Sequence, residues 1–132
     1  MIEESYVSFE TARLLKEAGF DVPCTSQYTE NEFAWENLRK TDFNKSDYVF
    51  SRPTQALAAR WLREVHGIHA SIDIFMDSEN DADGKTVDEW TFWSWSLFDS
   101  SGRIINISDD RYDTYEEALE GGLKHGLKLI KK

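Results

Sequence analysis

The sequence is short of cysteine, of proline and of uninterrupted apolar segments. Its single cysteine, Cys24, excludes an intramolecular disulfide. No apolar run is long enough to cross a bilayer, and the first residues lack the basic and apolar regions of a signal peptide. We therefore expect a cytoplasmic protein that does not enter a membrane.

Basic residues are scarce as well. The 15 Lys and Arg stand against 25 Asp and Glu, which gives a net charge of -10. This balance argues against direct binding of nucleic acid, because contacts with phosphates need clustered basic side chains. It leaves open a basic protein as partner, a metal cation, or a role in solubility.

Sequence motifs of catalysis are missing. The serines form no Gly-x-Ser-x-Gly elbow, and no glycine pattern of a phosphate-binding loop occurs. The histidines, His66, His69 and His125, have no cysteine or carboxylate at the spacing of a zinc site. Nothing nominates a base for Cys24, which we interpret as a structural thiol. We therefore expect no cofactor and assign no catalytic residue.

Aromatic side chains, in contrast, are abundant at 14% of the chain, and the stretch from 88 to 108 is built around them. It reads as two antiparallel strands joined by a tight turn, in which Gly102 accepts a positive φ. Alternation places Trp93 and Trp95 on one face of the first strand and Trp90 on the other. Apolar bulk on both faces indicates a central strand that is covered on both sides.

Apolar residues at helical spacing predict three helices. The first spans residues 9–18 with Ser8 as its N-cap. The second has Pro53 at its first helical position. The third follows Thr114, whose capping box is completed by Glu117. The residues expected to be buried on these helices are Phe9, Ala12, Leu15 and Ala18, then Leu57, Ala58, Trp61, Leu62 and Val65, and finally Leu119, Leu123, Leu127 and Ile130.

The last helix carries glycines at 121, 122 and 126. Each glycine in a helix costs about 1 kcal/mol relative to alanine, so this helix is intrinsically poor. We expect close approach of its backbone to large aromatic side chains of the sheet to offset that cost. Gly122→Leu should then destabilise the protein by overpacking.

Apolar and polar residues alternate from Ile68 to Met76, which predicts a strand with one core face. Its core face would carry Ile68, Ala70, Ile72, Ile74 and Met76. Residues 77–87 read as an acidic loop that leads to the aromatic strand.

Residues 25–52 admit two interpretations. Short strands near 25–29 and 47–50 can pair across a loop, or residues 32–39 form one or two helical turns. Together with the first helix, this segment is available to cover the second face of the sheet. A dimer interface would cover that face equally well.

These elements predict one α+β domain over residues 1–132, with an antiparallel meander and two helices on one face. From residue 53 the order is α-β-β-β-α, preceded by an N-terminal helix and an irregular or short-stranded segment. Double-stranded-RNA-binding domains share this order. The loop and helix start that are basic in those domains are acidic here, so the shared topology carries no function.

Three segments of the chain, Tyr6 to Asp21, Pro53 to Arg63 and Thr114 to Leu123, resemble a family of small uncharacterised proteins from bacteria and their phages or mobile elements. The resemblance covers the two ends of the chain and its middle helix. It implies an accessory protein rather than a core metabolic enzyme, and it implies no activity, cofactor or site residue.

The acidic loop supplies the candidate metal ligands. Glu79, Asp81 and Asp83 fall at the first, third and fifth positions of a calcium loop whose glycine would be Gly84. The twelfth position should be glutamate but is Trp90, and the flanking residues read as strands rather than helices. A solvated acidic loop is the favoured interpretation.

Four residues are the candidate ligand-binding set. Trp35 and Tyr48 are aromatic residues within a polar segment, where they can line a groove. His69 and Asp73 lie on the polar face of the strand that begins near residue 68. A site between residues 25–52 and the sheet would bring the four together.

Three functions follow as hypotheses. The first is a non-catalytic acidic accessory or protein-interaction module, which binds a basic protein or a second copy of itself. The alternative is a small enzyme or ligand-binding protein that uses the site between residues 25–52 and the sheet. A further alternative is an acidic mimic of nucleic acid that binds a basic protein, which requires the carboxylates of 77–89 and 109–120 to form one surface.

Overall fold

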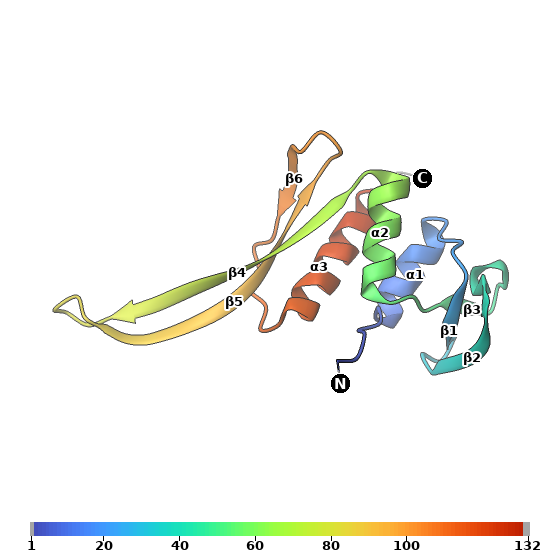
Figure 1. Cartoon of the computed structure of the whole chain (residues 1–132), viewed down its shortest axis with the longest axis horizontal. Coiled ribbons are helices and arrows are strands. Elements are labelled where there is room, and N and C mark those ends of the chain that lie inside the picture. The colour runs from blue at the N-terminus through green and yellow to red at the C-terminus, as the bar shows by residue number, and fades with distance from the viewer. Residues whose placement is uncertain (1, 131–132) are drawn as a thin grey trace.

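Three α-helices lie between two small antiparallel sheets in the computed structural model of the chain, which describes residues 2–130 (Figure 1). The α+β class, the element order and the two helices on one face of a meander are confirmed. No helix in the described part of the chain has the length and apolar character needed to span a membrane. The elements are α1 (Phe9–Glu17), β1 (Cys24–Thr29), β2 (Ala34–Thr41), η1 (Phe43–Lys45), β3 (Val49–Ser51), α2 (Gln55–His66), β4 (His69–Asn80), β5 (Thr86–Phe98), β6 (Ile104–Ile107) and α3 (Tyr115–Lys128).

The larger sheet has the order β4-β5-β6, so the aromatic strand β5 is central as expected. Its pairing with β4 runs from His69 opposite Phe98 to Asn80 opposite Thr86. The prediction of an acidic loop over 77–87 is therefore wrong in extent. Strands β4 and β5 stay paired through most of residues 77–87. Charged residues are tolerated there because both faces of these strand ends are exposed to water.

Helix α3 packs on one face of this sheet through its glycines. A Cβ at Gly122 would lie 3.2 Å from the Cβ of Trp95, and one at Gly126 would lie 2.9 Å from Leu62 Cδ2. The expected close approach is confirmed, although Gly126 meets a leucine of α2 rather than an aromatic ring. Around this contact lies the buried core, which includes Leu15, Phe20, Ala58, Trp61, Leu97, Leu119, Leu123 and Leu127.

Two details of α2 differ from expectation. Thr54 is its N-cap, because the Thr54 hydroxyl accepts a hydrogen bond from Leu57 N at 3.2 Å, and Pro53 therefore precedes the helix. Val65 is 59% exposed, so it does not belong to the buried stripe. Gln55 is buried in its stead, on the side of α2 that meets α3.

Residues 24–51 form a second sheet, with the order β2-β1-β3. The strands expected near 25–29 and 47–50 do pair, with Tyr28 opposite Phe50. The helical interpretation of residues 32–39 is wrong, since most of them belong to β2. This sheet packs beside α1, where the Phe9 ring lies 5.7 Å from that of Tyr28.

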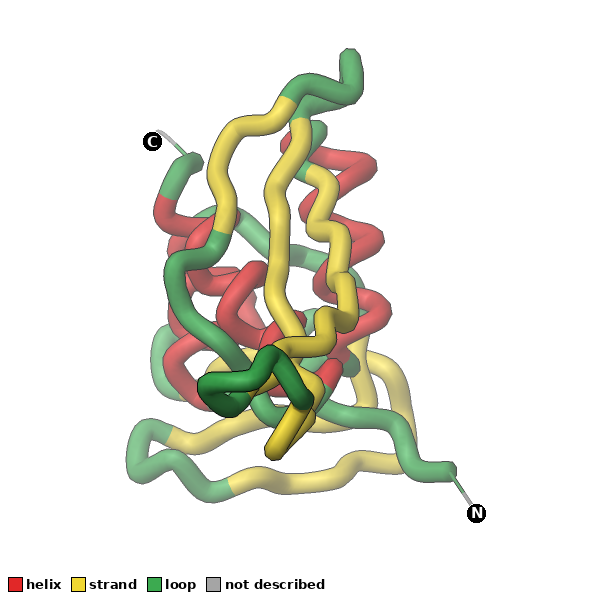
Figure 2. The backbone as a smooth tube through the Cα atoms, turned by 90° about the vertical axis from the view of Figure 1, so that its left-hand side faces the viewer, coloured by secondary structure: helices red, strands yellow, loops and turns green. Residues whose placement is uncertain are grey.

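The second face of the larger sheet is open, which corrects the expectation that β5 is covered on both sides. The helices separate the two sheets, so residues 24–51 do not reach that face (Figure 1). Seen from the side away from the helices, the strands of the larger sheet lie in front of them (Figure 2). Ile104 and Ile107 on β6 are 59% and 52% exposed.

A polar network that the sequence did not reveal joins α3 to the start of α1. One carboxylate oxygen of Glu120, Oε2, accepts hydrogen bonds from Ser8 N at 3.1 Å, from Ser8 Oγ at 2.8 Å and from the Thr11 hydroxyl. Its other oxygen accepts from Gln55 Nε2 at 3.1 Å. Thr11 is fully buried, so the carboxylate satisfies donors that water cannot reach.

Candidate functional site

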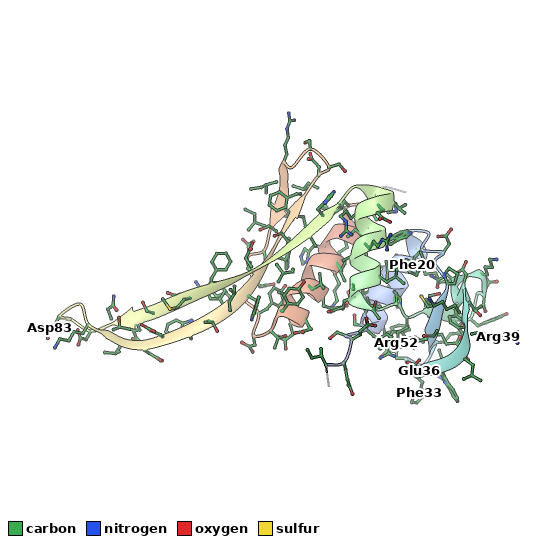
Figure 3. The ribbon with its side chains drawn as sticks, in the orientation of Figure 1. Phe20, Phe33, Glu36, Arg39, Arg52 and Asp83 are labelled. Carbon is green, nitrogen blue, oxygen red and sulfur yellow. The ribbon has the colours of Figure 1, made fainter. Side chains whose placement is uncertain are left out.

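The most prominent surface feature is a two-stranded arm, formed by residues 73–92 at the far ends of β4 and β5. It extends away from the helices, with Asp83 near its tip (Figures 1 and 3). Most of its residues are exposed. An isolated two-stranded hairpin is at best marginally stable in water. An arm of this length therefore has little stability of its own when no second molecule packs against it.

Large apolar side chains are exposed along this arm. The exposed fractions are 54% at Ile74, 48% at Phe75, 68% at Met76 and 42% at Trp90. The expectation that Ile74 and Met76 belong to the core is wrong, because the strand runs past the end of the helix that would have covered them. Exposed apolar patches of this kind mark surfaces at which another molecule binds.

The register assigns the arm residues to its two faces, since directly paired residues share a face. Trp93, Trp95 and their partners point toward α3, where the Trp93 ring lies 5.6 Å from that of Tyr115. The opposite side of the sheet is called here the open face. On the arm, the open face carries Asp73, Phe75, Asp77 and Glu79 from β4, and Asp88, Trp90 and Phe92 from β5.

At the base of the arm, one cation already lies on the open face. Phe75 and Phe92 stack with their ring centres 5.4 Å apart. The Arg111 guanidinium lies 4.2 Å from the centre of the Phe92 ring, and its Nη1 is 2.7 Å from Asp77 Oδ2. The hydrogen bond from Arg111, together with one from Ser78 N, lowers the pKa of Asp77 below its ordinary value. One aromatic ring and one carboxylate of this face, Phe92 and Asp77, therefore hold an arginine.

The candidate ligand-binding residues do not share a site. His69 and Asp73 lie on the open face of the larger sheet, as expected for its polar side. Trp35 lies on β2 of the small sheet and is 59% exposed, and Tyr48 is exposed before β3. The small sheet, marked by the Glu36–Arg52 ion pair, is on the other side of the helices from Asp83 (Figure 3). Within residues 2–130, the helices therefore lie between residues 25–52 and the larger sheet, and no groove lies between these two parts alone.

The candidate metal ligands lie at the tip of the arm. Glu79 is on β4, whereas Asp81 and Asp83 are in the turn. Asp81 Oδ1 accepts hydrogen bonds from Asp83 N and Lys85 N, both at 2.9 Å, so its carboxylate shapes the turn. Within residues 2–130, no group of three His, Cys, Asp or Glu is arranged to hold a metal ion.

Cys24 is buried, as its interpretation as a structural thiol requires. Burial, with a smaller contribution from the Asp42 carboxylate, raises the pKa of the thiol to about 11. A thiol with so high a pKa is a poor nucleophile at neutral pH. His66 packs edge-on against Trp61, with ring centres 4.8 Å apart, and forms no ion pair with a carboxylate of residues 2–130.

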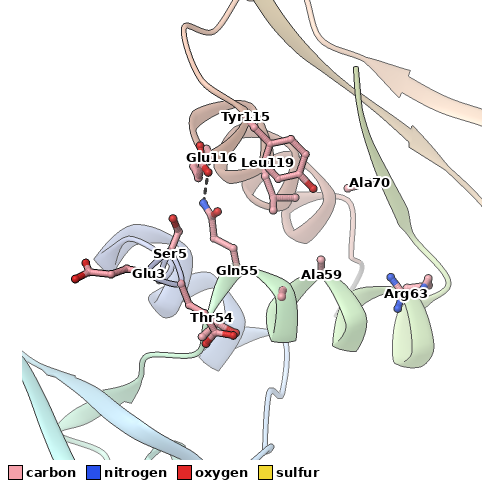
Figure 4. Close-up of a pocket in the computed structure, with 12 residues that line it drawn as sticks. Glu3, Ser5, Thr54, Gln55, Ala59, Arg63, Ala70, Tyr115, Glu116 and Leu119 are labelled. Carbon is pink, nitrogen blue, oxygen red and sulfur yellow. Dashed lines mark hydrogen bonds between the residues drawn. The ribbon is translucent and has the colours of Figure 1, made fainter. Parts of the chain in front are cut away.

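A cleft of about 400 Å³ lies between α2 and α3 (Figure 4). Gln55 lines it, and its amide Nε2 donates to the Glu116 carbonyl oxygen at 2.9 Å. Tyr115, Arg63 and Glu3 are also among the lining residues. Its lining contains no histidine or cysteine. The cleft therefore lies where α2 and α3 meet, and its polar lining consists of hydroxyl, carboxylate, amide and guanidinium groups.

Phe75 and Arg111 belong to the candidate site, and the sequence pointed to neither of them. Phe75 was an isolated apolar residue on the polar face of a strand, which is a weak signal by itself. Arg111 lies in the polar connection before α3, and nothing in the sequence indicated its partner. No protein family model, curated protein or solved structure matches the chain. The resemblance to a family of small bacterial and phage proteins stays a prediction.

Proposed function

We propose that the chain is a non-catalytic protein-interaction module that docks through the open face of its arm and sheet. The observation that carries this proposal is the exposure of Phe75 and Trp90 on the open face of a two-stranded arm that extends beyond the helices. The rest of the chain contributes little to the stability of such an arm, because the helices do not reach it. Contact with a second protein would bury its apolar side chains and stabilise the paired strands.

The open face continues from the arm onto the body of the sheet. Phe98 lies opposite Ile104, and Ser96 lies opposite Ile107, so Ile104 and Ile107 share the face of Phe92 and Phe75. An apolar centre with charged residues around it is the usual composition of a protein interface. The small sheet and the helices have no comparable extension.

The proposal is tested with a photo-cross-linking amino acid, p-benzoylphenylalanine, in cells that naturally produce the chain. Placed at Phe75, it should give a discrete adduct that contains a second protein. The control position is Leu38, which is fully exposed on the small sheet on the other side of the helices and should give no such adduct. Absence of an adduct at Phe75, or the same adducts at both positions, would contradict the proposed function.

A further inference from the structure

We infer that the open face of the arm binds an arginine-bearing basic segment of its partner, at a site formed by Trp90, Glu79 and Asp88. The inference rests on the proposed function and names the chemistry of the partner. It is argued from an arginine that the chain itself places on the neighbouring part of the same face.

Arg111 shows how this surface holds a guanidinium. Its planar group lies over the ring of Phe92 and bonds to the carboxylate of Asp77. In the register, Phe92 is opposite Phe75, and Asp77 is two residues nearer the tip than Phe75. The guanidinium therefore bridges an aromatic ring on β5 and the carboxylate diagonally across from it on β4.

The same arrangement recurs one step nearer the tip. Trp90 is opposite Asp77, and Glu79 is two residues further along β4, so ring and carboxylate again lie on a diagonal. Two residues along a strand span about 7 Å, which separates the two positions enough for two guanidinium groups. Tryptophan is a better partner for a cation than phenylalanine is.

The position nearer the tip, at Trp90 and Glu79, has a second carboxylate besides that of Glu79. Asp88 lies directly opposite Glu79, and like charges in direct cross-strand pairs destabilise a sheet. Neither residue forms an ion pair within residues 2–130. A cation between the two carboxylates would remove their repulsion.

The negative charge of the arm favours a basic segment over other binding partners. Residues 73–92 contain seven carboxylates and one basic residue, Lys85. Nucleic acid is therefore repelled, and so is a second copy of the arm, which would bring the same seven carboxylates. A guanidinium suits the site better than an ammonium does, because it stacks on an aromatic face and bonds to a carboxylate at the same time.

The experiment titrates an alternating arginine–serine peptide into the full-length ¹⁵N-labelled protein. The readout is the indole N–H resonance of Trp90, assigned with a Trp90→Phe variant. The expected result is saturable movement of this resonance and of the Glu79 and Asp88 amides. A lysine–serine peptide of equal length should bind about threefold more weakly or worse, because an ammonium cannot stack on the ring.

Two double variants that each remove two negative charges distinguish binding at this site from general electrostatic attraction to an acidic protein. Glu79→Gln with Asp88→Asn should weaken binding of the arginine peptide about tenfold, the effect of losing two exposed charge contacts at one site. Glu30→Gln with Glu32→Gln removes the same charge at the turn of the small sheet and should weaken it less than twofold. The first pair should fold at least as well as the wild type, since it relieves a repulsion.

Three results would overturn the inference. The first is an equal loss of affinity in both pairs of variants, which would show attraction to net charge only. The second is equal binding of the lysine and arginine peptides. The third is a dimer that forms with rising protein concentration and becomes more stable in the double variant Glu79→Gln with Asp88→Asn. That result would mean that a second copy of the chain occupies the open face. If Phe75 gives an adduct in cells but the peptide titration fails, the interaction module stands and only its partner's chemistry is wrong.

Discussion

The rings of Phe75 and Phe92 stack across two strands with 19° between their planes, on a face that no other element of the described chain covers. Directly paired aromatic residues stabilise a sheet by about 0.5–1 kcal/mol beyond their burial. The pair therefore stiffens the base of the arm where it leaves the helices. It also supports Arg111, which lies on the Phe92 ring.

We predict a measurable coupling between these two rings. Phe75→Ala and Phe92→Ala should each destabilise the protein, and the double variant should lose about 0.5–1 kcal/mol less than the sum of the single losses. The measurement is urea unfolding of the four proteins in the cycle. Additive losses would show that the rings do not interact in solution.

The ion pair between Asp77 and Arg111 should be visible in a pH titration. The Asp77 carboxyl should titrate below its ordinary pKa, and Arg111→Gln should raise that pKa part of the way, because the bond from Ser78 N remains. Since the folded-state pKa is the lower one, the stabilisation is present above the unfolded-state pKa and is lost as pH falls through the folded-state pKa. Carboxyl ¹³C NMR measures both proteins. An unchanged Asp77 pKa in the variant would contradict the contact.

Gly122→Leu should destabilise the protein by about 1–3 kcal/mol, because its side chain would have to displace Trp95 from the core. Lys128→Leu, on an exposed position in the last turn of the same helix, is the matched control and should stay within about 0.5 kcal/mol of the wild type. Thermal unfolding compares them. A Gly122→Leu melt equal to that of the wild type would show that the close approach does not exist.

The Glu120 network makes a separate prediction. Glu120→Gln keeps the shape of the side chain but turns an amide group toward donors, so a buried hydrogen bond to Ser8, Thr11 or Gln55 is lost. The expected cost is about 1–3 kcal/mol. Glu117→Gln, one turn earlier and exposed, is the control. Equal stability of the two variants would show that the Glu120 contacts contribute nothing.

Cys24 should resist alkylation in the native state. Its raised pKa of about 11 keeps the thiol protonated, and burial blocks access. Iodoacetamide at about pH 8 should modify it slowly in the folded protein and rapidly in urea, where the thiol regains ordinary reactivity. Rapid modification of the folded protein would mean that the first residues of β1 are exposed.

The sequence predicted the elements that follow local rules. Ser8 and Thr114 are N-caps, as their types and positions indicated, and the hydroxyl of Thr114 accepts from Glu117 N at 3.1 Å. The glycines of α3 correctly indicated close packing, because nothing else explains a helix with so poor an intrinsic propensity. The meander followed from strands that succeed one another with short connections.

The sequence could not predict where the helices stop covering the sheet. Alternation continues through Ile74 and Met76 whether or not a helix lies above them, so both were assigned to the core. The acidic residues from 77 onward suggested a loop, since charge is a weak signal for a strand that faces water on both sides. The sequence also could not show on which side of the helices each sheet lies. The candidate ligand-binding set requires Trp35 and Asp73 on one side, and the structure places them on opposite sides.

The most direct test of the docking surface compares the accessibility of the open face in purified protein and in cells. Cys24 is buried, so a cysteine placed at Ile107 on the open face is the reactive thiol, and one at Leu38 is the control. Both should react rapidly with a maleimide in purified protein. In cells that naturally produce the chain, we predict protection at Ile107 and none at Leu38. Equal reactivity of the two positions in those cells would contradict this prediction.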